Sequence, residues 1–475
     1  MAQNSLEIES RVSSKRDVKT SSPVYFLSLT VENVRCFGSK QTLDLSDGEG
    51  RPSQWTVMLG NNGVGKTTIL QSLAMLAPSA NPALSEFLKS RYEPALQDPK
   101  INFIKSREVV YPKYLDSPMY LNWNYYRHQA EFFYLSGAFS VSSKLNKRQI
   151  GKTISNFHLG KDKEGSLLFS ATDYTELPNC VCFGYGASRR MGETSLSEKS
   201  EDNPYASLFS ENVELLNAEE WLLQADYAAS KPSHVQRRAA KRRDDIKDVL
   251  VNLLPDVEDI RFARLTEKQM KPGVEVKTPY GWVSIKDLSL GYKTLIAWMV
   301  DLASRLFDRY PDSPNPLAEP AVVLVDEIDL HLHPKWQRNL MSFLSERFPN
   351  TQFIATAHSP LVVQAATDAN IVLLRREGDH VVIDNNVKAI QGWRVDQVLT
   401  SDLFGLESAR PPQLDKLLAE RTKILSKARL TKRDKEKLER IEAEIGELPT
   451  GETPEDIEAM DVIRRAAARL KAEGY

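Results

Sequence analysis

The sequence predicts an α/β fold built on a parallel sheet. Three apolar runs, at residues 55–59, 321–325 and 352–357, carry this prediction, because each has the continuous hydrophobicity of a strand buried on both faces. Ligands of such sheets bind beyond the carboxyl ends of the strands. The residues that follow the three runs are therefore expected to meet in one site.

A glycine-rich loop follows the first run and fits the pattern G-x-x-x-x-G-K-[ST]. It consists of Gly60, Asn61, Asn62, Gly63, Val64, Gly65, Lys66, Thr67 and Thr68. Helical spacing resumes over residues 69–76, so the loop joins a strand to a helix N-terminus, where backbone N–H groups and the helix dipole favour a phosphate. In this setting Lys66 reaches the β and γ oxygens and the Thr67 hydroxyl ligates Mg²⁺. A glycine turn with a chance lysine is the alternative, which the flanking strand and helix disfavour.

Two carboxylates end the second run, and a histidine ends the third. Asp326 is expected to hold Mg²⁺ through water, and Glu327 to polarise the water that attacks the γ-phosphate. His358 follows after one predicted helix at 334–347 and is expected to sense the γ-phosphate. A histidine of the hydrophobic core is the alternative for His358.

A fourth pattern lies upstream of the Asp-Glu pair. The L-S-x-G signature of the ABC ATPase superfamily is matched by Leu288, Ser289, Leu290 and Gly291, which precede an apolar helix over 294–306. Alone, this pattern usually indicates a helix cap. In chain order, however, the phosphate loop, L-S-x-G, Asp-Glu and histidine resemble the ABC-type ATPases of the RecF, SMC and OLD group, over about residues 23–406.

The resemblance implies a P-loop ATPase that binds and hydrolyses ATP with Mg²⁺. It also implies a homodimer or higher homo-oligomer with head-to-tail contacts, in which Ser289 and Gly291 of one subunit present donors to the γ-phosphate held by another. Residues 26–37 look like the group's first strand and its N-x-R-x-F turn, followed by a return strand at 41–45. Phe37 is the nearest candidate for an aromatic ring that stacks on adenine.

The loop after the Asp-Glu pair shows which branch of this group the chain resembles most. It looks like the D-E-x-x-x-x-L-H-P of RecF-like and OLD-like ATPases, with His333 as the dimer-contacting loop residue and Pro334 as the first helical position. The alternative is a two-histidine metal site at His331 and His333, which lacks an evident third ligand.

Two further segments resemble a bacterial group. Residues 183–190 look like the Y-G-x-x-R-R segment, and residues 392–400 with 403–406 look like the post-ATPase segment, of phage-defence ATPases such as the PtuA subunit of Septu systems and retron-associated ATPases. The implied role is a sensor or regulatory subunit that acts with a separate effector chain, a nuclease or a toxin. A RecF-like ATP-gated DNA-binding protein of repair is the second hypothesis, and a transporter ATPase the third.

Some roles of the wider group are disfavoured by what the sequence lacks. After His358 there is no D-x-D of the kind that OLD nucleases carry, and there is no H-N-H cluster, so the chain is not expected to cut nucleic acid itself. The stretch between Lys66 and Ser289 has no sustained heptads, which disfavours an SMC-type coiled-coil arm.

Composition predicts a cytoplasmic protein. The 475 residues include 62 basic and 64 acidic side chains, for a net charge of −2, so any contact with nucleic acid must be local. Three cysteines cannot form a disulfide framework. No apolar run approaches the ~20 residues of a membrane span, so no membrane partner is expected.

Residues that interrupt helix and strand patterns, together with runs of charge, suggest the domain organisation. Residues 1–22 are expected to be a disordered leader and 23–406 the ATPase domain, with two insertions. The first, 78–178, consists either of antiparallel strands that extend the sheet or of a docking surface for a partner or nucleic acid. The second, 211–256, is helical and carries a basic run at 237–243, either a solvated helix face or a phosphate-contacting patch. Residues 407–475 form a C-terminal helical region with a helical hairpin and a last helix from about 453 to 471.

Overall fold

The protein is described from a computed structural model. The described residues are 24–79, 111–112, 133–141, 153–161, 167–171, 180–193, 204–263, 272–387, 392–427, 430–446, 462 and 466. The leader expected at 1–22, much of the insertion at 78–178 and nearly all of the last predicted helix lie outside these ranges. The chain forms two compact units, residues 1–391 and 392–475.

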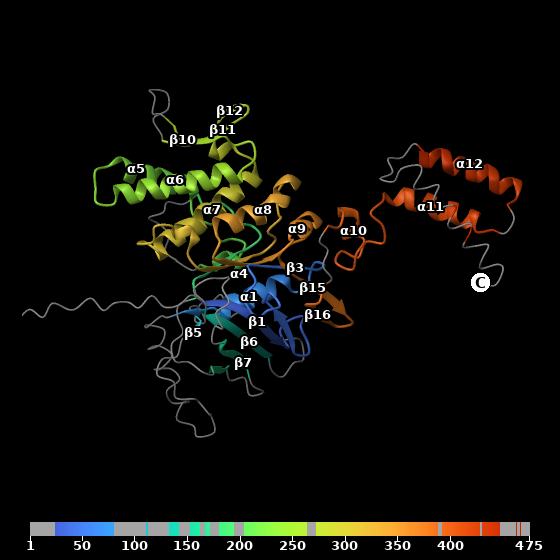
Figure 1. Ribbon diagram of the computed structural model, residues 1–475, viewed down its shortest axis with the longest axis horizontal. Helices are drawn as coiled ribbons and strands as arrows, with labels where there is room; N and C mark the ends of the chain where they lie inside the picture. Colours follow the sequence, from blue (N-terminus) through green and yellow to red (C-terminus); the bar gives the residue numbers. More distant parts are fainter. Residues whose placement is uncertain are drawn as a thin grey trace, which may run out of the picture. The chain divides into compact units, whose positions relative to one another are not determined.

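A six-stranded sheet is the centre of the first unit and confirms the predicted α/β fold (Figure 1). Its order is β16-β15-β3-β14-β13-β9, and every neighbouring pair is parallel except β15 and β16. The strands are β3 (Trp55–Leu59), β9 (Cys182–Tyr185), β13 (Ala321–Val325), β14 (Thr351–Thr356), β15 (Asn370–Glu377) and β16 (His380–Asp384). The three apolar runs of the sequence are thus the adjacent strands β3, β14 and β13, all fully buried.

A second, antiparallel sheet has the order β2-β1-β6-β7-β8. Its strands are β1 (Val24–Glu32), β2 (Gln41–Asp44), β6 (Phe133–Val141), β7 (Thr153–Lys161) and β8 (Leu167–Ala171). The last three belong to the insertion at 78–178 and extend the sheet of β1, which is the first of the two arrangements considered for this segment. A short pair of strands, β4 (Pro78–Ser79) and β5 (Tyr111–Pro112), lies in the same insertion.

Helix α1 (Lys66–Leu76) lies between the two sheets and is buried along nearly its whole length (Figure 1). One hydrophobic cluster joins α1 to β1 and β2 on one side and to the central sheet on the other. Burial on all sides explains why this helix has no polar face beyond its first turn, a stretch in which Gln71 and Ser72 are the only polar residues and both are buried. The N-terminus of α1 is held by this packing beside the carboxyl ends of the central strands.

Most of the remaining helices cover the other face of the central sheet (Figure 1). They are α5 (Ala218–Ser230), α6 (Gln236–Leu253), α7 (Leu290–Arg309), α8 (Pro334–Arg347) and α9 (Pro360–Ala365), with the 3-10 turns η3 (Ile285–Asp287) and η4 (Pro316–Ala318). The short α4 (Ala206–Phe209) instead packs beside α1, where Gln71 Nε2 donates to the Leu208 carbonyl at 2.8 Å. Strands β10 (Asp259–Phe262), β11 (Val274–Thr278) and β12 (Gly281–Ser284) form a small antiparallel sheet. The side chain of Asn217 caps α5 by accepting from the Glu220 N–H.

The second unit is helical. Helix α10 (Val395–Leu399) precedes α11 (Pro412–Leu425) and α12 (Lys432–Gly446), and the last two pack as the predicted hairpin. Its apolar core contains Leu414, Ile424, Ile441 and Ile445. The division between the two units falls at 391–392, whereas the ATPase domain was expected to extend to 406. Residues 392–406 fold locally around the buried Val398 and group with the second unit.

No helix within the described ranges is long and apolar enough to span a membrane.

Candidate nucleotide-binding and hydrolysis site

The glycine loop leaves β3 and turns directly into α1. Gly60, Gly63 and Gly65 have φ angles of 141°, 79° and 84°, a region that other residues rarely adopt. A Cβ atom at Gly60 would lie 2.3 Å from the carbonyl oxygen of Leu374, and one at Gly65 would lie 2.5 Å from Cys36 Sγ. Glycine is therefore required at both ends of the loop for two reasons, the positive φ angle and the lack of space for a Cβ atom. The loop keeps its main chain close to β15 and to the turn after β1.

The side chain of Lys66 is folded over this loop. Its Nζ donates to the carbonyl oxygens of Gly60 at 2.7 Å and Asn61 at 3.0 Å. Burial lowers the pKa of Lys66, and the carboxylates of Asp326, Glu327 and Asp329 oppose the shift. An ammonium group held in this way is poised to exchange carbonyl oxygens for phosphate oxygens, which carry more negative charge.

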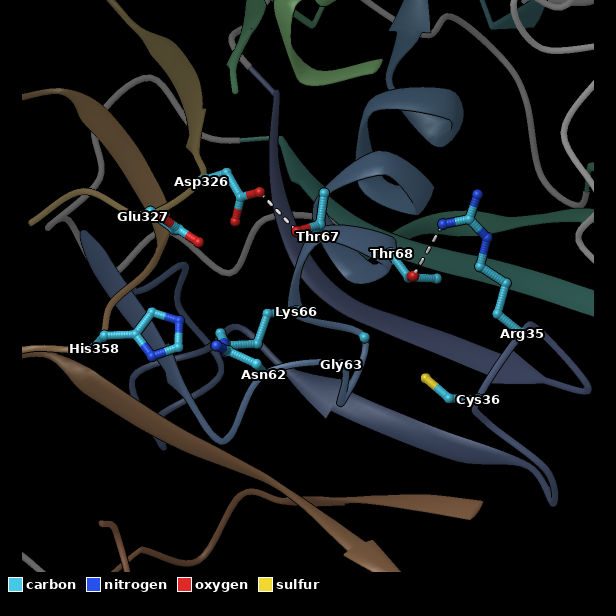
Figure 2. Close-up of a pocket in the computed structure, with 11 residues that line it drawn as sticks. Arg35, Cys36, Asn62, Gly63, Lys66, Thr67, Thr68, Asp326, Glu327 and His358 are labelled. Atoms are coloured by element: carbon cyan, nitrogen blue, oxygen red, sulfur yellow. Dashed lines mark hydrogen bonds between the residues drawn. The ribbon is translucent and has the colours of Figure 1, made fainter. Parts of the chain in front are cut away.

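Asp326 is fixed by two hydroxyl groups. Its Oδ2 accepts from Thr67 Oγ1 at 2.6 Å (Figure 2). Its Oδ1 accepts from Thr356 Oγ1 at 2.7 Å. These contacts join the first turn of α1 to the ends of β13 and β14. Adjacent hydroxyl and carboxylate oxygens are the ligand type that Mg²⁺ prefers, so Thr67 and Asp326 fit the predicted metal site.

Glu327 has an unusual main-chain conformation, with a φ of 48°. Its N–H donates to Thr356 Oγ1 at 2.7 Å, so a single threonine holds both members of the Asp-Glu pair. Non-glycine residues in this region are uncommon and cluster at functional sites, where the surrounding structure maintains them.

His358 lies at the opposite side of the cavity from Arg35 (Figure 2). The His358 N–H donates to both carboxylate oxygens of Asp329, at 3.2 and 3.0 Å. The imidazole is exposed and faces the cavity, which excludes the alternative of a core histidine. Asp329, which the sequence analysis left without a role, sets the turn that presents this ring.

One cavity of about 440 Å³ joins these groups. It is lined by Arg35, Cys36, Asn62, Gly63, Gly65, Lys66, Thr67, Thr68, Asp326, Glu327 and His358 (Figure 2). Five predicted side chains from three separate segments thus converge: Lys66, Thr67, Asp326, Glu327 and His358. The predicted loop residues Gly60 and Asn61 contribute carbonyl groups to Lys66, whereas Val64 packs into the core.

Three residues, Arg35, Cys36 and Thr356, lie at the site without having been predicted to do so. Arg35 lines the cavity and its Nη1 donates to Thr68 Oγ1 at 3.4 Å, and Cys36 lies beside it. Thr356 holds the Asp-Glu pair from β14. A signal existed only for Arg35, which belongs to the N-x-R-x-F turn.

The adenine-stacking hypothesis for Phe37 is wrong. Its ring is fully buried in the cluster around α1 and packs where a Cβ of Gly65 would be, so it supports the loop instead of lining the cavity. Burying the phenylalanine ring in the core is more favourable than leaving it exposed to solvent at the rim of the site.

Ser289 and Gly291 lie outside this cavity. Ser289 precedes α7 and is exposed, and its hydroxyl does not cap the helix. Leu290 is 55% exposed. A Cβ at Gly291 would lie 2.5 Å from the carbonyl oxygen of His331, so the signature turn rests on the loop that follows the Asp-Glu pair.

The two-histidine metal site receives no support within the described ranges. His333 Nδ1 accepts from the Lys335 N–H at 3.3 Å and caps α8, which begins at Pro334 as predicted. No group of three histidine, cysteine, aspartate or glutamate residues suited to a metal occurs among the residues that the structure describes.

The basic run lies on α6, and most of its charges have acidic neighbours. The pairs are Arg238–Asp312 at 3.4 Å, Lys241–Asp245 at 2.6 Å, Arg242–Asp308 at 3.7 Å and Arg243–Asp226 at 2.8 Å. This neutralisation weakens the field that a nucleic acid would meet. Contact with nucleic acid at 237–243 stays a prediction.

Comparison with known proteins places the site in context. Residues 90–364 match the family described as AAA domain, putative AbiEii toxin, Type IV TA system. The Septu protein PtuA of Bacillus mycoides (strain KBAB4) is 26% identical over 404 residues, 84% of this chain and 47% of that protein. The Retron Ec83 probable ATPase of Escherichia coli is 34% identical over 202 residues, 42% of this chain and 35% of that protein. The chain thus spans less than half the length of these relatives, which confirm the resemblance to Septu and retron ATPases.

Solved structures that resemble the chain include the SMC head domain from Thermotoga maritima, with 14% identity and a TM-score of 0.38 over 75% of this chain and 97% of that one. The recombination mediator protein RecF in its ATP-bound form has 12% identity and a TM-score of 0.37, over 77% of this chain and 99% of that one.

Proposed function

The chain belongs to the family described as AAA domain, putative AbiEii toxin, Type IV TA system, and from this premise we propose that it is an Mg²⁺-dependent ATPase that regulates an anti-phage defence complex. In this proposal it binds and hydrolyses ATP, and a separate effector chain responds to its nucleotide state. The observation that carries the proposal is the convergence of Lys66, Thr67, Asp326, Glu327 and His358 on one cavity.

Each side chain has a role that its contacts support. Lys66 moves its ammonium from the loop carbonyls to the β and γ oxygens, and the loop N–H groups surround the β-phosphate. Thr67 and Asp326 supply oxygen ligands for Mg²⁺, which would neutralise charge on the β and γ oxygens. Glu327 orients and polarises the attacking water, and His358 contacts the γ-phosphate.

The proposed active unit is a head-to-tail homodimer or a higher homo-oligomer. Ser289, Leu290 and Gly291 are at the surface and do not reach the cavity of their own chain. An exposed turn at a helix N-terminus, with a hydroxyl not used for capping, suits donation to an anion held by another subunit. Each ATP would then be enclosed by the phosphate loop of one chain and the signature turn of its partner.

The regulatory role rests on the relatives. Similarity to the Septu protein PtuA and to a retron probable ATPase supports a place in defence, where hydrolysis changes the state of the dimer and thereby an effector nuclease or toxin. The cytoplasm is the proposed location.

Purified protein tests the core of this proposal. Release of phosphate from ATP that requires Mg²⁺, and that falls sharply in Glu327→Gln, is the expected result. The exposed Glu346 of α8 provides a matched control, since Glu346→Gln changes the same charge outside the cavity. Absence of ATP binding and turnover in the wild-type protein would overturn the proposal.

A further inference from the structure

Arg189 is an almost fully buried cation directly behind the Asp-Glu pair. It follows β9 in the Tyr-Gly-x-x-Arg-Arg segment, with a relative exposure of 1% and a φ of 35°. Arginine is seldom buried to this extent unless its donors are engaged, because removing the charge from water is unfavourable. Its contacts therefore indicate what the burial achieves.

The guanidinium group of Arg189 donates to main-chain carbonyl oxygens around the site. Nη1 donates to the Asp326 carbonyl and, at 3.1 Å, to that of Gly186, while Nη2 donates to the Glu327 carbonyl at 2.8 Å. A planar fork of fixed geometry thus spans the two residues predicted to hold Mg²⁺ and to activate water. Nε of Arg189 has no hydrogen-bond partner among the described residues.

Electrostatics keep this buried group charged. Burial lowers the pKa of Arg189 to about 10, and the carboxylates of Asp326, Asp329 and Glu327 oppose the shift. The side chain therefore stays protonated near neutral pH. A cation behind the three acids also reduces the repulsion among their carboxylates, which would otherwise disfavour placing them close together.

The same segment is anchored to the signature helix α7. Tyr185 Oη donates to Asp301 Oδ2 at 3.0 Å, and Asp301 also pairs with Arg305 at 2.6 Å. The Arg189 guanidinium lies 5.6 Å from the ring centre of Trp298 on α7. The main chain is tied in as well, because the Asp326 N–H donates to the Tyr185 carbonyl at 2.8 Å.

We propose that Arg189 is a positioning residue for ATP hydrolysis, which holds the main chain of Asp326 and Glu327 so that the Glu327 carboxylate faces the attacking water. The inference rests on the proposed ATPase function. It gives Arg189, the first of the two arginines in this segment, a task other than binding phosphate: holding the main chain of the Asp-Glu pair. The unusual φ of Glu327 is the reason that such a clamp is needed, because the main chain would otherwise relax to a more common conformation.

The experiment measures kcat and the dissociation constant for ATP in Arg189→Lys and Arg189→Met. Lysine keeps the charge but loses the fork, and methionine keeps much of the volume but loses both. We expect kcat to fall by about tenfold or more in each, because a slightly misplaced base is costly, while ATP affinity stays within about threefold. The adjacent and exposed Arg190 gives the control, since Arg190→Lys should retain the wild-type kcat.

A double-mutant cycle separates positioning from general structural support. If Arg189 acts through the Glu327 carboxylate, Arg189→Lys should reduce turnover in the wild-type background and have almost no further effect in a Glu327→Gln background. Thermal unfolding of each protein accompanies the kinetics. Should Arg189→Met fail to fold, Arg189→Lys alone decides the question.

Several outcomes would overturn the inference. A wild-type kcat in Arg189→Lys, a loss of ATP binding equal to the loss of turnover, or independent effects in the cycle would each assign Arg189 a merely structural role. In all three cases the wild-type protein still hydrolyses ATP, so the proposed function survives. A wild-type protein without ATPase activity would remove both.

Discussion

At the scale of single residues, the proposed roles place nucleotide binding and water activation on different side chains. Lys66 ends the phosphate loop and its ammonium donates to two loop carbonyls, whereas Glu327 lies at the end of β13, held by Thr356 and Arg189. The two groups sit on different elements, so each can be removed without displacing the other. Substitutions at the two positions should therefore have different consequences.

We expect Lys66→Ala to raise the dissociation constant for ATP by about a hundredfold or more, because an ammonium contact to phosphate is lost from a largely buried site. Glu327→Gln should keep wild-type affinity and lower kcat by about a hundredfold or more. Binding of a fluorescent ATP analogue and phosphate release measure the two effects. Lys335→Ala on the exposed start of α8 controls for loss of a lysine. Near-normal turnover in Glu327→Gln would remove the carboxylate from its assigned role.

Thr356 offers a second test at this scale. Thr356→Val removes the hydroxyl that serves Asp326 and Glu327, leaving a Glu327 N–H without its acceptor, so we expect the free energy of unfolding to fall by about 1–3 kcal/mol and turnover to fall with it.

Thr351→Val is the matched control on the same strand. Thr351 is equally buried, and its hydroxyl has no hydrogen-bond partner among the described residues. A methyl group in its place should leave stability unchanged or slightly higher. Chemical denaturation compares the two variants, and equal losses of stability would show that the Thr356 contacts are not special.

At the scale of elements, the signature turn before α7 presents residues that its own cavity does not use. Ser289 is exposed, and Leu290 exposes an apolar side chain, as an interface would require. The composite-site proposal depends on this turn acting on another chain.

We expect Ser289→Arg to lower ATPase activity by about tenfold or more without weakening ATP binding, because it blocks the site of the partner rather than its own. Mixing Ser289→Arg protein with Lys66→Ala protein should restore part of the activity, since a mixed dimer keeps one intact composite site. Analytical ultracentrifugation in the presence of ATP checks the assembly. Loss of ATP binding by the Ser289→Arg monomer would contradict the model.

Some elements of the fold could be predicted from the sequence, and others could not. Local signals were enough to predict three strands and one loop. Continuous apolar runs indicate the strands at 55–59, 321–325 and 352–357, and glycine spacing indicates the loop between Gly60 and Thr68. Thr356 and Arg189 were not predictable in this way, because their roles depend on which strands are neighbours in the sheet. Phe37 was misread because the same aromatic residue suits a site rim or a core, and only packing decides. The structure divides between residues 391 and 392, before the end at 406 expected for the ATPase domain, and composition does not reveal the local folding that buries Val398.

At the scale of the whole molecule, the defence proposal assigns ATP hydrolysis to this chain and the toxic reaction to a separate effector chain. The purified protein should hydrolyse ATP yet leave plasmid DNA uncut with Mg²⁺ or Mn²⁺, and protection against phage should require a neighbouring gene. Cleavage assays, and plaque counts with each gene deleted, measure both. Metal-dependent cleavage abolished by mutating this chain's own carboxylates would overturn the proposal, as would unchanged phage sensitivity with the whole cluster present.

The second hypothesis, an ATP-gated DNA clamp, makes a different prediction for the whole molecule. Tight, ATP-dependent and strongly salt-dependent binding to duplex DNA would favour it. The ion pairs of Arg238, Lys241 and Arg243 on α6 argue for weak binding there. Binding measured at two salt concentrations with and without ATP distinguishes the two hypotheses.

The contact between Gly291 and the His331 carbonyl has a consequence for how two sites would work together. The aromatic rings of Tyr292 and Trp336 reinforce it, with centres 4.7 Å apart. Within one chain, the turn that would complete the partner's site rests on the loop leading from its own Glu327. A shift in that loop on binding ATP would therefore alter the neighbouring site, making the two sites cooperative. The rate of hydrolysis should rise sigmoidally with ATP concentration, and Tyr292→Ala should return the curve toward a simple hyperbola.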